Sequence, residues 1–191
     1  MAFAFWKTRT APGTCTCTAL QGFDEEHRIA YAQPVADRFP SDTSYKMSDE
    51  RPNDIQLADA IANRDNYLLV SPALRAFLEA EGGARAEFLP TQILNHKGRV
   101  ASDEYVIVNV LDVHDAIDLD RSEVKWNNID PDKISWFDEL VLDEERIPAD
   151  CRMLRLQHFT NRLLVREDLA DEIRNQGFTG VSFVATEGFT R

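Results

Sequence analysis

The apolar positions of this chain follow the same arrangement twice, in two stretches that begin 95 residues apart, at Leu68 and Leu163. Residues 68–89 and 163–184 each open with a short apolar run, continue with apolar residues three and four positions apart, and close with a second apolar run. Spacing of three and four places side chains on one face of a helix, whereas short continuous apolar runs indicate buried strands. Each stretch therefore predicts a strand, a short helix and a second strand.

The residues that bound each predicted helix support this interpretation. Ser71 suits the N-cap of the first helix and Pro72 its first turn, while Arg166 is a poor cap for the second. Gly82 and Gly177 follow the helices, where a left-handed residue commonly ends them. We expect these positions to form part of the hydrophobic core. The two stretches could have arisen by duplication of one unit or by convergence of two. The matching pairs are Leu69 and Leu164, Val70 and Val165, Leu74 and Leu169, Leu78 and Ile173, Gly82 and Gly177, and Phe88 and Phe183.

The N-terminal part of the chain shows no regular pattern, because prolines at positions 12, 34, 40 and 52 interrupt it. We expect residues 1–50 to form an irregular segment packed on a main domain of residues 51–191. A short helix is predicted after Asn53 or Asp54, with Ile55, Ala58 and Ile61 on one face.

Strands are predicted over most of the remaining chain. Residues 93–94 and 105–111 favour a hairpin, and the second of these runs is apolar on both faces, which is typical of a central strand. Residues 140–142 and 153–156 predict two more strands. The fold class that follows is α+β, with one mostly antiparallel or mixed sheet and a few short helices packed on it.

Composition is that of a soluble globular protein, with 191 residues, 43% of them apolar and 28% charged. No apolar run is long enough for a membrane span, and the N-terminal apolar run is too short for a signal peptide. Three cysteines, at positions 15, 17 and 151, make no disulfide framework. We therefore expect reduced thiols with no shared role, in a cytoplasmic protein.

Negative charge is concentrated in residues 101–150, which hold fifteen acids and four bases, a net of −11 out of −12 for the whole chain. The other 141 residues are nearly balanced, with eighteen acids and seventeen bases. A field of one sign repels nucleic acid and anionic lipid and attracts basic partners. The charge pattern therefore predicts a basic protein partner, with neither nucleic acid nor membrane as a partner.

The acidic residues carry no recognisable catalytic or metal-binding motif. Read as a calcium loop from Asp118, the run has Glu123 in place of the turn glycine and Ile129 in place of the bidentate glutamate. As a transition-metal ligand, His114 lacks a second histidine nearby. As a nucleophile, Ser182 lies in a predicted strand and not in the sharp turn of a nucleophile elbow. We predict no catalytic residue, metal ligand or cofactor site. An enzyme that acts on a cationic substrate through the carboxylates of residues 112–120 stays open as an alternative.

Two tryptophans within the acidic block favour binding instead. Large aromatic residues often anchor protein interfaces, and surrounding charges steer the partners together. A second interpretation is that Trp126 and Trp136 are buried in the core. A third is that the protein is a self-associating regulatory module in which both indoles form a homodimer contact. The predicted partner-binding residues are Asp112, Asp115, Asp118, Asp120, Glu123, Trp126, Trp136, Asp138 and Glu139.

An ordered set of segments resembles a known family. These segments are residues 55–61, 68–71, 87–90, 105–111, 115–118, 140–143, 153–156 and 177–183. Together they are similar to immunity-protein family eleven of bacterial polymorphic-toxin systems, formerly a domain of unknown function, over residues 40–185. The resemblance implies a cytoplasmic antitoxin that binds a cognate toxin and neutralises it by stoichiometric inhibition. It supplies no catalytic residues.

Overall fold

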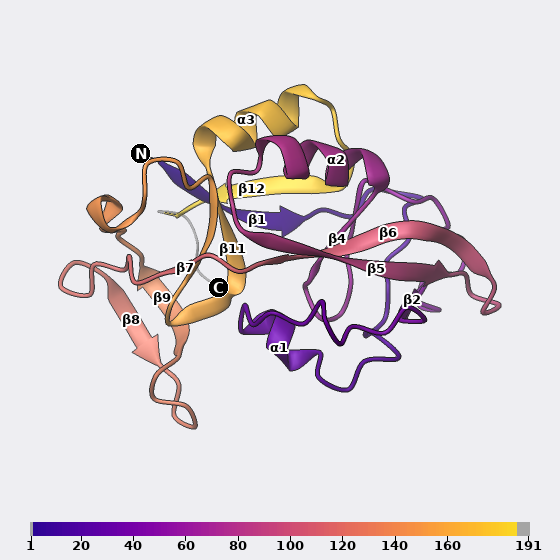
Figure 1. Cartoon of the computed structure of the whole chain (residues 1–191), viewed down its shortest axis with the longest axis horizontal. Helices are drawn as coiled ribbons and strands as arrows, with labels where there is room; N and C mark the ends of the chain where they lie inside the picture. Colours follow the sequence, from indigo (N-terminus) through magenta and orange to yellow (C-terminus); the bar gives the residue numbers. More distant parts are fainter. Residues whose placement is uncertain (1, 187–191) are drawn as a thin grey trace.

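The computed structural model describes residues 2–186, which form two five-stranded sheets, a separate hairpin and three short α-helices (Figure 1). The first sheet has the order β12-β1-β11-β10-β7, from β1 (Phe3–Thr8), β7 (Val113–His114), β10 (Met153–Leu156), β11 (Phe159–Arg166) and β12 (Val181–Ala185). The second has the order β2-β5-β6-β4-β3, from β2 (Ser44–Lys46), β3 (Ala60–Ile61), β4 (Leu68–Val70), β5 (Ala86–Leu94) and β6 (Val100–Val110). The hairpin is β8 (Glu123–Trp126) and β9 (Ile134–Glu139), and the helices are α1 (His27–Ala30), α2 (Pro72–Glu81) and α3 (Glu167–Asn175).

These elements confirm the predicted α+β class, although the strands divide between two main sheets. Most pairs are antiparallel, and β7 with β10 and β2 with β5 are parallel. The predicted hairpin is β5 with β6, and β10 covers the same residues as the strand predicted there. Within the described residues, no helix has both the length and the apolar character needed to cross a membrane.

The two repeated stretches fold as predicted, into β4-α2-β5 and β11-α3-β12, and each encloses a third, antiparallel strand. Ile107 of β6 lies opposite Leu69 and Leu89, and Phe5 of β1 lies opposite Leu164 and Val184. Leu164 and Val184 are the residues 95 positions after Leu69 and Leu89. The repeat therefore includes the strand register, with the third strand taken from a different part of the chain in each unit.

Helices α2 and α3 lie side by side over the sheets (Figure 1) and share one core. Leu74 and Leu78 of α2 and Leu169 and Ile173 of α3 are buried in the same apolar cluster. The Ser71 hydroxyl accepts the Leu74 N–H at 3.3 Å, as expected of an N-cap. The second helix has no side-chain cap bond. The core between the units is therefore built from equivalent positions of both.

The N-terminal segment contributes a strand to each of the two sheets. β1 lies between β11 and β12, and β2 extends the second sheet beside β5. Between them the path is largely irregular apart from α1, and Phe23, Ile29 and Val35 pack in a cluster against the second sheet. Residues 1–50 thus contribute a central strand as well as an irregular stretch.

Three local predictions are wrong. Residues 53–61 form no helix, because Ile61 pairs with Leu69 across β3 and β4, which leaves Ile55 exposed. Residues 140–142 contribute one bridge, between Leu142 and Ile117, because the chain turns away after β9. Gly82 is helical, with φ −64°, and its successor Gly83 takes the left-handed conformation, with φ +54°.

Candidate partner-binding surface

The hairpin β8–β9 projects from one end of the molecule and is held there by its apolar inner face (Figure 1). Phe137 is fully buried, and its ring meets that of Phe159 edge to face with centroids 4.8 Å apart. Val124, opposite Phe137, packs against the same cluster. The register shifts twice along the hairpin, and the first shift makes Asp138 an extra residue on β9. Such bulges redirect side chains, and the outer face here is polar apart from Trp136.

The two tryptophans lie on opposite faces of this hairpin. Trp126 pairs with Ile134 and is 37% exposed, with its ring 5.3 Å from the ring of His158. Trp136 pairs with Lys125 on the other face and is half-buried. Its Nε1 donates a hydrogen bond to Asp138 at 2.8 Å. Neither indole is sealed in the core.

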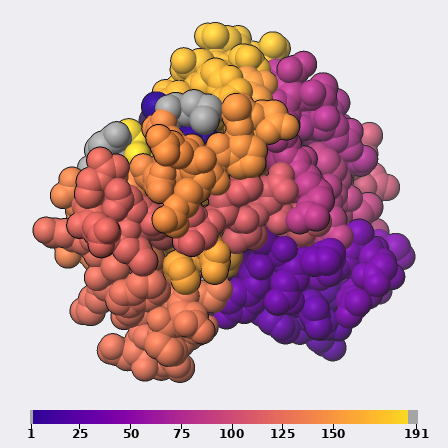
Figure 2. Space-filling model, turned by 60° about the vertical axis from the view of Figure 1, so that its left-hand side comes forward, coloured from indigo at the N-terminus to yellow at the C-terminus, as the bar shows by residue number. Residues whose placement is uncertain are grey.

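An acidic groove of about 750 Å³ adjoins the hairpin. Residues 115–122 and 138–147 run together there, because the Asp118 N–H donates to Val141 at 3.0 Å and the Asp143 N–H to Ala116 at 2.9 Å. Among the described residues, Arg121 is the one base of the lining. Figure 2 shows this part of the chain spread over one side of the molecule. The acids of the groove are Asp118, Asp138, Glu139, Asp143, Glu144 and Glu145.

Three predicted residues are held by arginines of the same chain. Asp112 accepts the backbone N–H of Arg85 at 2.8 Å, away from the groove. Asp115 pairs with Arg146 at 3.3 Å. Asp118 accepts Nε of Arg121 at 2.6 Å, and this bond lowers the pKa of the Asp118 carboxyl. These carboxylates order the loops that shape the surface.

Other carboxylates of this end have no ion-pair partner among residues 2–186. Asp120, Glu123, Glu139 and Glu145 are exposed, and no base lies within 4.0 Å of them. Glu123 and Glu139 face each other directly across the hairpin. Like charges in such a pair destabilise a hairpin by roughly 0.2–1 kcal/mol. This end therefore keeps negative charge that no base among residues 2–186 neutralises.

The structure brings most of the predicted residues to one end but gives them different positions. Asp118, Asp138 and Glu139 line the acidic groove, and Asp120 follows in the adjoining turn. Glu123, Trp126 and Trp136 lie on the hairpin beside it. Asp143, Glu144 and Glu145 also line the groove but were not among the predicted residues, although their acidic run is visible in the sequence.

Chemistry beyond binding finds little support at this surface. Among the described residues, no three His, Cys, Asp or Glu side chains are grouped so as to hold a metal ion. The lowered pKa of Asp118 favours its charged form, the opposite of what a general acid requires. His114 Nε2 lies 3.8 Å from the Cys151 sulfur, and burial raises the pKa of that thiol to about 11. This thiol is therefore protonated at neutral pH and a weak nucleophile.

Comparison with known proteins identifies the family of this chain. No sequence among the curated proteins matches the chain. The model of the immunity protein family Imm11 matches residues 5–187, which include most of the N-terminal strand β1 and nearly all of the acidic groove. Because the match spans almost the whole length, this chain belongs to the immunity protein family Imm11.

Proposed function

We propose that this protein neutralises a cognate toxin by binding it through the acidic end, which comprises the acidic groove and the outer face of the hairpin β8–β9. The single observation that carries the proposal is that Asp120, Glu123, Glu139 and Glu145, exposed in and beside the groove, have no base within 4.0 Å among residues 2–186. Its complement is a basic surface on the toxin, such as one that binds nucleic acid or another anionic substrate. Covering that surface would block the toxin without any chemical step.

The arrangement suits fast association. Charges at an interface rim raise the encounter rate, and this effect weakens as salt screens the field. The half-buried Trp136 can add an apolar contact at the outer face of the hairpin, where Lys125, Ser135 and Asp138 surround it. Aromatic residues in such positions contribute more to affinity than the charges around them.

The first test is coexpression with the toxin encoded beside this protein in its genome. We expect growth to be rescued and the two proteins to copurify in a defined ratio. The mass of the chain alone, measured by light scattering, shows whether it enters the complex as a monomer or as a homodimer. Failure of both rescue and copurification would refute the proposal.

The second test locates the interface by charge reversal. The double variant Glu139→Lys with Glu145→Lys changes the charge of the acidic end. The control variant, Asp103→Lys with Glu104→Lys, makes the same charge change on β6, outside the acidic end. We expect the first variant to slow association about tenfold or more at low salt, with a smaller effect at high salt. Equal slowing in both variants would mean that the acidic end is not the interface.

A further inference from the structure

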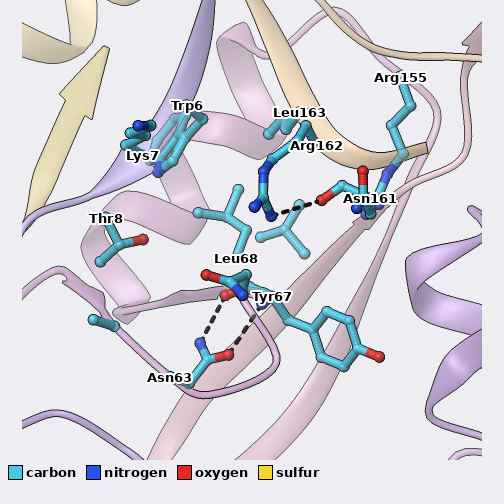
Figure 3. Close-up of a pocket in the computed structure, with 13 residues that line it drawn as sticks. Trp6, Lys7, Thr8, Asn63, Tyr67, Leu68, Arg155, Asn161, Arg162 and Leu163 are labelled. Carbon is cyan, nitrogen blue, oxygen red and sulfur yellow. Dashed lines mark hydrogen bonds between the residues drawn. The ribbon is translucent and has the colours of Figure 1, made fainter. Parts of the chain in front are cut away.

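A second hollow, the basic cleft, has a volume of about 310 Å³ and lies where the two repeated units meet (Figure 3). Each unit contributes an equivalent triplet, residues 66–68 and 161–163, which are 95 positions apart. Trp6 and Val108 also line it, and they pair with the equivalent residues Phe183 and Phe88. The basic cleft is therefore lined by equivalent positions of the two units. Ligand sites are common at junctions of this kind.

The charge of this lining is opposite to that of the chain. Among the described residues, the charged side chains that line the basic cleft are those of Lys7, Arg155 and Arg162, with no acid. Because the whole chain has 33 acids and 21 bases, a lining whose charged residues are all basic differs from the composition of the chain. The remaining lining is Trp6, Thr8, Ala62, Asn63, Asn66, Tyr67, Leu68, Val108, Asn161 and Leu163.

Arg155 is a buried cation without a counter-ion. Its side chain is 7% exposed, and Nε and Nη1 donate to the backbone oxygens of Val110 at 3.1 Å and Thr160 at 2.6 Å. Among residues 2–186 no carboxylate lies within 4.0 Å of it. Burial lowers the pKa of Arg155 to about 10. Burying an unpaired charge costs free energy, and an anion bound beside the guanidinium would recover part of it.

Arg162 supplies a second guanidinium. Figure 3 shows its side chain directed into the basic cleft, where its Nη1 donates to the Asn161 oxygen at 3.4 Å. No carboxylate of the described residues pairs with it, and burial lowers its pKa. Trp6 Nε1 is also buried, with no acceptor among the described residues. The basic cleft thus offers several donors beside an apolar wall.

We propose that the basic cleft binds an organic anion of about mononucleotide size, which carries a phosphate or carboxylate group on an aromatic body. The anionic group would lie against Arg155 and Arg162, because the planar fork of an arginine matches both groups. The body would pack on Trp6, Leu68 and Leu163. This activity lies beyond the proposed function and does not depend on a toxin, since the acidic groove has the opposite charge.

Calorimetric titration of the full chain tests the proposal with two anions, adenosine monophosphate and 2-naphthoate. Adenosine and 2-naphthol are their uncharged counterparts at pH 7. We expect at least one anion to bind in a 1:1 ratio. The affinity of its uncharged counterpart should be lower by a factor of about ten or more. The anion that binds shows whether the site takes phosphate or carboxylate.

Variants connect binding to the basic cleft. Arg162→Gln should weaken the bound anion about tenfold or more, and Arg162→Lys less. Arg99→Gln, at the tip of the β5–β6 hairpin, makes the same charge change and should leave binding unchanged. Thermal unfolding of each variant checks that the fold is intact.

Two outcomes would overturn this assignment. One is that neither anion binds at millimolar concentration, and the other is that Arg162→Gln binds as tightly as Arg99→Gln. If the small anions fail and Arg162→Gln instead loses affinity for the toxin, the basic cleft receives an acidic side chain of the toxin and the proposed ligand is wrong.

Discussion

Replacing Gly180 by alanine tests how closely the second unit docks on the first. Gly180 has φ +78°, and a Cβ atom built on it would lie 2.0 Å from the Ala60 oxygen. The same loop is joined to its neighbours by two hydrogen bonds, from the Arg9 N–H to the Gly180 oxygen at 2.8 Å and from the Ala60 N–H to the Thr179 oxygen at 3.0 Å. The new methyl group must therefore push the loop and Ala60 apart.

The expected loss of stability follows from these contacts. A left-handed alanine costs roughly 1–2 kcal/mol. Loss of the two hydrogen bonds adds roughly 0.5–1.5 kcal/mol each, which gives a total of roughly 2–5 kcal/mol. Gly177 is the matched control, since it has φ +73° but no atom within 4 Å of a Cβ at that position. Gly177→Ala should cost only the conformational part, roughly 1–2 kcal/mol.

Urea unfolding followed by circular dichroism measures both variants. We expect Gly180→Ala to shift the midpoint well below that of Gly177→Ala with an unchanged slope, as a change in stability alone requires. Equal losses in the two variants would refute the close approach of the residue 180 loop to Ala60. A more stable Gly180→Ala protein would refute it as well.

Three further predictions concern other parts of the structure. Phe137→Ala should cost roughly 3–5 kcal/mol in urea unfolding because it empties a buried site, and a loss as small as that of Trp136→Ala would show that the hairpin is not anchored by Phe137. Arg166 lowers the pKa of Asp168 to about 2. The free energy of unfolding of the wild type should therefore exceed that of Asp168→Asn by its full amount above pH ~4, and the difference should disappear as the pH falls through about 2. A difference in unfolding midpoint that stays constant with pH would contradict this. The three cysteines are buried, so Ellman's reagent should label the native chain far more slowly than the chain in urea, and equal rates would mean that the thiols are exposed.

The repeated units could be predicted from the sequence because their signals are local. Helical spacing and the Ser71 cap depend on residues within a few positions of one another, and the structure reproduces both. The acidic character of residues 101–150 was equally visible, since charge is a property of composition. Neither signal identifies which strand completes each unit.

The failed helix at residues 53–61 shows the limit of periodicity. Ile55, Ala58 and Ile61 have helical spacing, but Ala60 and Ile61 pair with Val70 and Leu69 instead. An open edge of β4 offers hydrogen bonds that local preference cannot foresee. The tryptophans were ambiguous for a similar reason, because pairing across the hairpin decides which face each one occupies.

By itself, the sequence determined the α+β class, the two strand–helix–strand units and the acidic character of one region. Only the tertiary structure decided that β1 and β6 complete those units, which acids are neutralised by arginines, and that Lys7, Arg155 and Arg162 share a cleft. The physical reason is distance along the chain. Periodicity and capping act over a few residues, whereas strand pairing and charge pairing depend on which distant segments the folded core brings together.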